Sequence, residues 1–335
     1  MTAATPVWKG HLVDSNCRWQ RYGDLVDDRS LDEKGSIPPR WTWEQSYIST
    51  EQPSGLKSHQ LLHSIDDDVR EYLIEGGMDG FLADHFASIL TRDPLLLTEA
   101  DLKDSDPPET RLFETLYGCV WHPVRFKPPT GDRGPGWRVE FRPMEAQLTD
   151  FENAAFAIFA YFVSRAITVL RLKFYIPVEK LSDAWATGQD RGAVIGGRFW
   201  FRKTGWLSDS DKINPDIIRM LSQHGYHYTS KESYAQMTVD EVVNGEGTIN
   251  GFPGLLLMLR CYFEYVGVPM EEQEQIARYL NLIRDRARGR NPTPATWIRE
   301  FIGNHKDYAE DSYISEKVCY DMMRTIIQLN EKKSE

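Results

Sequence analysis

The sequence predicts an α+β fold in which helices outnumber strands, and two observations support this prediction. Residues 137–142 alternate large apolar and charged side chains, which is the period of a β-strand with two different faces. The similar stretch 124–127, joined to it by a glycine- and proline-rich connection, predicts a partner strand in a hairpin. Beyond residue 150 most of the chain carries apolar residues at helical spacing.

The strand at 137–142 presents one apolar and one charged face. The apolar face holds Trp137, Val139 and Phe141, and the charged face holds Arg138, Glu140 and Arg142. Two interpretations of the charged face stay open. It is either a solvated row of mixed charge on an antiparallel strand, or the wall of a polar cavity that binds an anion and a metal ion together. Arginine forks match phosphate and carboxylate oxygens, and Mg²⁺ usually takes only one or two protein carboxylates.

A helix is expected directly after this strand. Pro143 has no N–H to donate and ends the strand, and Thr149 and Glu152 have the spacing of a capping box, which predicts a helix from about Asp150 to about Leu172. Its apolar run is too short for a membrane span, because Arg165 interrupts it early. A buried core helix is therefore predicted.

Other helices are predicted along the chain from their spacing and end signals. They are 65–92, divided by glycines, then 178–187, a helix with Pro253 in its first turn, 270–288, and closing helices within 297–308 and 314–329. The tail from Asn330 onward is expected to be disordered. Four arginines end the 270–288 helix and suit the negative end of its dipole: Arg284, Arg286, Arg288 and Arg290. In 191–203, two alternatives stay open for Arg198, Arg202 and Lys203, an anion site or ordinary surface cations.

Composition limits the class of protein. With 335 residues and 41% hydrophobic content the chain is long enough for a sizeable core in one or two domains. A net charge of −11 argues against nucleic acid and anionic membranes as main partners. The cysteines Cys17, Cys119, Cys261 and Cys319 show no metal-binding spacing, and the opening residues hold no signal-peptide core, so we expect reduced thiols in a cytoplasmic protein.

Several segments resemble the catalytic subunit of eukaryotic-type glutamate–cysteine ligases. VEFRPMEAQLTDFEN at 139–153 carries the strongest likeness, and VRFKPP at 124–129 precedes it. The likeness continues in ATPVWKGHLVDSNCRW, FLADHFASILTRDPL, NGEGTINGFPGL and WIREFIGNHKDY. Members of that family carry a long amino-terminal half before the ATPVWKG segment, so this chain resembles the carboxy-terminal half.

The resemblance implies a fold and a reaction. The fold would be part of a curved antiparallel sheet funnel, similar to glutamine synthetase, with helices outside. Residues 1–335 would form one incomplete catalytic domain, with 1–150 as the active-site wall and 151–330 as a mainly helical portion. The reaction would join L-glutamate to L-cysteine with ATP and Mg²⁺, giving γ-glutamylcysteine through a γ-glutamyl phosphate, the first step of glutathione biosynthesis.

The match to the VEFR segment also implies roles for single residues. Glu140 would be a Mg²⁺ ligand, Arg142 would contact the transferring phosphate or the glutamate carboxylate, and Arg138 would assist from the same face. By the same resemblance Arg18 and His85 are candidates for binding substrate or phosphate.

Arg92, close to His85 in the sequence, is a third such candidate. For Arg18 the alternative is a surface arginine stacked on Trp19, and for His85 a histidine with a purely structural place in a core.

Two functions remain open at this stage. The chain is either part of an active ligase or a non-catalytic fragment or paralogue that binds a partner ligase subunit. A sheet wall without its neighbouring strands leaves exposed edges and an apolar face. We therefore expect the chain alone to be poorly soluble or to associate with a further polypeptide, such as the amino-terminal half or a modifier subunit.

Overall fold

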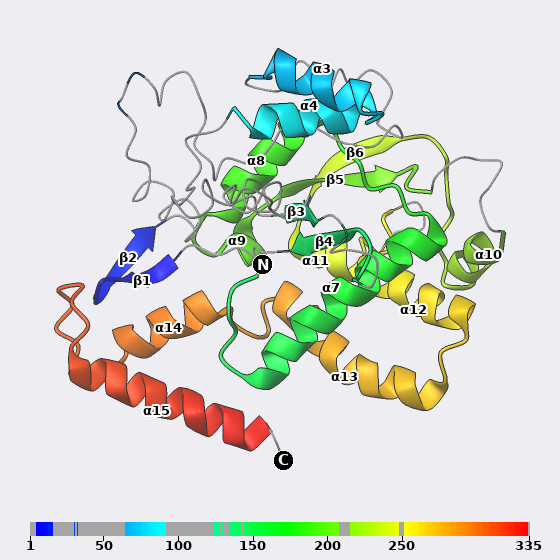
Figure 1. Ribbon diagram of the computed structural model, residues 1–335. Helices are drawn as coiled ribbons and strands as arrows, with labels where there is room; N and C mark the ends of the chain where they lie inside the picture. The colour runs from blue at the N-terminus through cyan, green and yellow to red at the C-terminus, as the bar shows by residue number, and fades with distance from the viewer. Residues whose placement is uncertain are drawn as a thin grey trace. The chain divides into compact units, whose positions relative to one another are not determined.

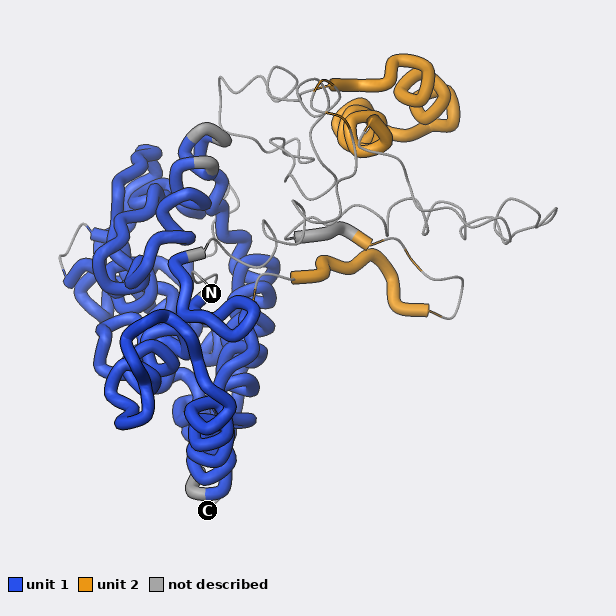
Figure 2. The backbone as a smooth tube through the Cα atoms, turned by 90° about the vertical axis from the view of Figure 1, so that its left-hand side faces the viewer, with its two compact units in different colours: residues 1–16, 145–335 blue, residues 17–144 orange. Residues whose placement is uncertain are grey.

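The computed structural model describes most of the carboxy-terminal two thirds of the chain and shorter stretches before it. The described residues are 5–15, 30, 32, 64–91, 124–127, 129, 134–141, 144–207, 215–247 and 251–333. They fall into two compact units (Figure 2). Unit 1 comprises residues 1–16 and 145–335, and unit 2 comprises residues 17–144. The structure is mixed helix and antiparallel sheet, which agrees with the predicted α+β class.

The described part of unit 2 contains a helix pair and a hairpin. Its elements are α3 (Asp67–Glu75), α4 (Gly80–Ile89), β3 (Val124–Lys127) and β4 (Arg138–Phe141). The predicted division of the 65–92 helix is confirmed, because Asp66 and Asp79 each cap a separate helix by accepting backbone N–H groups. The predicted hairpin is confirmed as well, since β3 and β4 pair antiparallel.

Within the described residues, unit 1 holds the other helices and two further strand pairs (Figure 1). Its helices are α7 (Asp150–Leu170), α8 (Val178–Gly188), α9 (Ala193–Gly196), α10 (Pro215–Gln223), α11 (Val239–Asn244), α12 (Leu255–Val266), α13 (Met270–Ala287), α14 (Pro294–Gly303) and α15 (Glu316–Lys333). Its strands are β1 (Thr5–Trp8), β2 (His11–Ser15), β5 (Phe199–Thr204) and β6 (Ser233–Met237). The strands β1, β2, β5 and β6 and the helices α9 and α10 were not predicted.

The long helix α7 is the centre of the unit 1 core. It packs against α12 and α13, with Phe151 stacked on Tyr279 at 4.9 Å between ring centroids and Phe162 edge-on to Phe263 at 4.9 Å. By length and composition alone α7 would also suit a membrane. Its buried side chains, such as Phe159, belong to the main hydrophobic cluster, whereas Tyr161 is 59% exposed. The helix is therefore a core helix with an exposed face, and the prediction that it is buried holds for one side only.

The first strands of the chain lie beside its last helices. Leu12 N donates to Ser312 O at 2.8 Å, and Ile314 N donates to Gly10 O at 2.8 Å, so β2 pairs with the segment between α14 and α15. Arg299 of α14 donates to Val13 O at 2.6 Å. These contacts join residues about 300 positions apart, which explains why the sequence alone did not indicate them.

Arg202 on β5 is a buried structural residue, and neither of its two predicted roles is right. Its side chain is 0% exposed, and its guanidinium donates to Tyr175 O, Gly205 O and the Tyr234 hydroxyl, with Glu232 at 3.0 Å. Because these donors are satisfied by the protein, Arg202 stabilises the β5–β6 sheet and is not available to a ligand.

Two helix ends differ from the predictions for reasons of tertiary structure. The tail is helical to Lys333, and the Asn330 side chain accepts a hydrogen bond from Asp150 N at 3.0 Å, which ties the end of α15 to the start of α7. Helix α12 begins after Gly254, so Pro253 lies outside its first turn. Gly254 has φ +89°, and a Cβ there would lie 2.4 Å from the backbone nitrogen of Gly245. The predicted position of Pro253 is therefore wrong.

The described cysteines are free, as expected. Cys261 is buried in α12, and Cys319 lies half-buried in α15. Burial raises the pKa of Cys261 to about 11, so its thiol stays protonated and unreactive near neutral pH. Cys17 and Cys119 lie outside the described residues.

Candidate functional site

The two faces of β4 differ in exposure. The apolar side chains are exposed, at 53% for Trp137, 66% for Val139 and 41% for Phe141. Arg138 and Glu140, on the opposite face, are half-buried. A solvated charged row on a soluble sheet has the reverse pattern, with its charges exposed and its apolar side covered. The charged face of this strand is therefore the more enclosed one.

Glu140 lies beside a cation of the neighbouring strand. The Lys127 ammonium is 3.3 Å from a carboxylate oxygen of Glu140, and the two side chains are 38% and 31% exposed. In the hairpin register Glu140 lies opposite Arg125 and Arg138 opposite Lys127. Strand β3 therefore brings a cation, Lys127, close to Glu140.

The ligand atoms on the charged face of β4 suit Mg²⁺ better than other metal sites. Glu140 supplies a single half-exposed carboxylate, with a lysine at one of its oxygens. Mg²⁺ commonly binds one or two carboxylates and completes its shell with phosphate oxygens and water. The described residues here therefore suit Mg²⁺ held together with a polyphosphate better than a metal held by protein ligands alone.

The structure says less about the other residues that were predicted to form the site. Arg18, Arg92 and Arg142 lie outside the described residues, so their predicted roles stay predictions. His85 lies half-buried in α4, with its ring edge-on to Phe86 at 5.5 Å. The structure thus brings together Arg138 and Glu140, with His85 on a separate helix of the same unit.

The second part of the VEFRPMEAQLTDFEN segment builds the start of α7. The Thr149 hydroxyl accepts from Glu152 N at 3.3 Å, as the capping-box spacing predicts. The Glu152 carboxylate accepts from Leu148 N at 3.2 Å, one residue before the N-cap. Gln147 N donates to the Asn153 side chain at 3.0 Å, and that side chain donates to Thr149 O at 2.9 Å. The polar side chains in this part of the segment therefore stabilise the N-terminus of α7.

Arg286 of α13 anchors this helix start, and sequence reasoning missed that role. Its guanidinium donates to the Gln147 side chain at 3.0 Å and lies 3.6 Å from a Glu152 carboxylate oxygen. Arg286 is 6% exposed, and burial lowers its pKa while the Glu152 charge acts in the opposite direction. Arg286 lies in the last turn of α13, as the helix-dipole interpretation predicts, and its charge is also paired with Glu152 of α7.

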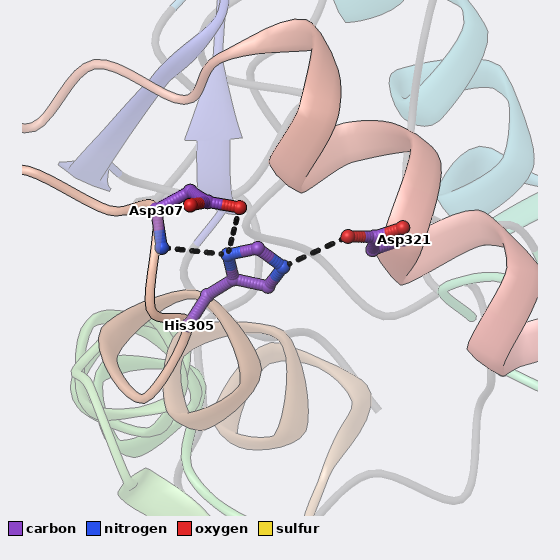
Figure 3. Close-up of side chains that lie close together, drawn as sticks. All are labelled: His305, Asp307 and Asp321. Atoms are coloured by element: carbon purple, nitrogen blue, oxygen red, sulfur yellow. Dashed lines mark hydrogen bonds and ion pairs between the residues drawn. The ribbon is translucent and has the colours of Figure 1, made fainter.

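A second polar cluster that the sequence did not reveal joins α14 to α15 (Figure 3). His305 Nε2 lies 3.2 Å from Asp321, and Asp307 N donates to His305 Nδ1 at 3.2 Å. One nitrogen or carboxylate oxygen from each of His305, Asp307 and Asp321 lies within 4.8 Å of the other two. However, Lys317 also pairs with Asp321 and lowers the pKa of that carboxyl. These ion pairs link the end of α14 to α15.

Comparison with known proteins supports the resemblance found in the sequence segments. The family model for glutamate–cysteine ligase matches residues 1–329. A glutamate–cysteine ligase of Neurospora crassa is 36% identical over 372 residues, covering 99% of this chain and 51% of its own length. The catalytic subunit of the Rattus norvegicus enzyme is 37% identical, covering 96% of this chain and 51% of its own length. The Schizosaccharomyces pombe enzyme is 35% identical, covering 98% and 47%.

The matches extend over nearly the whole chain, and they include β3, β4 and the capped start of α7. The chain spans about half the length of the relatives that it matches. It belongs to the glutamate–cysteine ligase family.

Proposed function

We propose that this chain forms one wall of the active site of a cytoplasmic glutamate–cysteine ligase. The observation that carries the proposal is the enclosed charged face of β4, where Glu140 lies beside Lys127 and Arg138, within a segment that matches the ligase family. In this proposal residues 1–335 are one portion of a single catalytic domain, and β3 and β4 belong to a larger sheet funnel similar to that of glutamine synthetase.

The proposed reaction joins L-glutamate to L-cysteine in two steps. The γ-phosphoryl group of ATP passes to the γ-carboxylate of glutamate, which releases ADP. The amine of cysteine then attacks the acyl carbon, phosphate leaves, and the amine loses a proton. Both steps bring anions together, so positioning and neutralisation of charge are the main demands on the protein.

Two residues of β4 and one that follows it in the sequence would meet these demands. Glu140 would hold Mg²⁺, which would supply charge neutralisation at the phosphates. Arg142 would contact the transferring phosphate or the glutamate carboxylate, and Arg138 would support the same anions from the strand face that carries Glu140. His85 and Arg18 contribute to the binding of substrate or phosphate.

Arg92 belongs to the same proposed group of substrate-binding residues. A fork of guanidinium donors suits a planar carboxylate or a phosphate, so each arginine of this set would orient an anion as well as neutralise it.

The test is phosphate release from Mg-ATP in the presence of glutamate and cysteine, by wild type and by Glu140→Ala. We expect Glu140→Ala to lower the rate by about 100-fold or more, because the metal loses its protein carboxylate. Asp216→Ala is the matched control, since Asp216 also makes an ion pair, with Arg219 at 2.9 Å on the surface of α10. Equal and measurable rates for wild type and Glu140→Ala would refute the assignment of Glu140.

A second candidate function, binding to a partner ligase polypeptide, is favoured by the exposed apolar side chains of β4. In this case the chain alone releases no phosphate, and it raises the rate of an added ligase polypeptide. Replacing Val139 by Lys would abolish that stimulation. A chain that turns over alone, with a rate unaffected by Val139→Lys, would exclude this candidate.

A further inference from the structure

Lys127 of β3 is a cation held beside Glu140 of β4. Its ammonium lies 3.3 Å from a carboxylate oxygen of Glu140, and the two side chains are 38% and 31% exposed. A half-exposed ion pair of this kind contributes little net stability, because water screens both charges. Stability therefore does not explain why a lysine lies at the acid that is proposed to bind Mg²⁺.

Cationic residues outnumber acidic ones at the paired positions of this hairpin. In the antiparallel register Arg125 lies opposite Glu140, and Lys127 lies opposite Arg138. All four residues belong to unit 2. One carboxylate that already lies close to an ammonium is a poor site for a divalent metal ion alone, because the positive charges repel each other.

A polyphosphate changes this balance of charge. Its oxygens can bind a metal ion and accept hydrogen bonds from an ammonium at the same time, so one anion neutralises both cations. A divalent ion at the Glu140 carboxylate should therefore bind more tightly together with a polyphosphate than alone. Two ligands that each strengthen the binding of the other are thermodynamically coupled.

We propose that Lys127 couples the binding of the divalent metal ion to the binding of the polyphosphate. The Lys127 ammonium disfavours the metal ion alone at Glu140, and it favours the complex of metal and nucleotide because it contacts the phosphate oxygens. The inference rests on the proposed function in one respect, that Glu140 binds Mg-ATP. Lys127 is then a substrate-binding residue as well as the counter-charge of Glu140.

The first measurement uses Mn²⁺ alone as the probe, without turnover. The readout is the broadening of the backbone amide signal of residue 140 in NMR spectra of the full chain. We expect Lys127→Met to lower the Mn²⁺ concentration for half broadening by about 10-fold, because a positive charge close to the metal ion is removed. Glu140→Ala should abolish the broadening at this position.

The second measurement is the Kd for Mg-ATP, determined by calorimetry on the same proteins. We expect Lys127→Met to raise this Kd by about 10-fold, since the phosphate loses a charge-assisted hydrogen bond. The two measurements should thus change in opposite directions, which a general loss of structure in the hairpin would not produce.

Two further variants separate the effect of charge from the loss of an ion pair. Lys127→Arg keeps a cation, and both measurements should stay within about 3-fold of wild type. Lys173→Met is the matched control, since the Lys173 ammonium lies 3.4 Å from a carboxylate oxygen of Glu232 in unit 1. This variant should change neither measurement by more than about 2-fold.

The inference is overturned if Lys127→Met leaves either measurement unchanged, if it weakens the binding of Mn²⁺ and Mg-ATP together, or if Lys127→Arg behaves like Lys127→Met. In each of these cases the proposed function survives, provided that wild type binds Mg-ATP and Glu140→Ala binds it less tightly. If wild type does not bind Mg-ATP, the proposed function and this inference both fail.

Discussion

Replacing Phe252 by Ala should destabilise unit 1 more than most substitutions. Phe252 is 0% exposed, and its ring contacts Phe201, Phe174 and Trp206, with centroids 5.0, 6.1 and 6.3 Å away. A buried aromatic side chain removes about 150–250 Å² from water, which at about 25 cal/mol per Å² corresponds to about 4–6 kcal/mol. Measured Phe→Ala losses of about 3–5 kcal/mol include partial relaxation of the cavity, and we expect a loss in that range.

The assay is urea unfolding followed by far-UV circular dichroism, with the midpoint and slope measured separately. Ile327→Ala is the control, because Ile327 is 55% exposed on α15 and its loss should change the free energy of unfolding by no more than about 0.5 kcal/mol. If Phe252→Ala lowers the free energy of unfolding by less than about 1 kcal/mol, with an unchanged slope, the reasoning that this ring is a main part of the aromatic cluster is refuted.

Two further predictions concern the backbone and the pH dependence of stability. Gly254→Ala should cost well over 1 kcal/mol in urea unfolding, because its Cβ would lie 2.4 Å from another backbone atom. Gly267→Ala, with φ +73° but no atom within 4 Å, should cost only about 1 kcal/mol, and equal losses would contradict the packing argument. The backbone hydrogen bond from Thr238 lowers the pKa of Glu241 below 4.5, so Glu241 contributes stability that is present above pH 4.5 and lost as the pH falls through its lowered pKa. The stability difference between wild type and Glu241→Gln should therefore be larger at pH 7 than at pH 3, and a difference that is constant with pH would count against this linkage.

Features that depend on near neighbours in the sequence were predictable. Thr149 and Glu152 are three positions apart, so their hydrogen bond follows from local helix geometry, and the start of α7 was predicted correctly. The β3–β4 hairpin was predictable for a similar reason, since period-2 alternation and a glycine-rich connection are both local signals. Arg138 and Glu140 share one face because alternate residues of a strand always do.

Features that depend on distant partners were not predictable. The contact of Arg286 with Gln147 spans 139 positions, and that of Arg299 with Val13 spans 286. In the sequence, His305 is one polar residue near the end of a helix, with nothing to indicate its partner. Asp321 reaches the His305 ring because α14 packs against α15.

The sequence by itself determined the α+β class, the two-faced strand carrying Glu140, the capped helix after it and the ligase family. Only the tertiary structure decided which face of β4 is enclosed, and which of the many arginines are buried. The physical reason is that alternation and helical spacing follow from the geometry of one element, whereas the burial of Arg202 and Arg286 is decided by side chains from other elements, which supply acceptors for charges that would be too costly to bury alone.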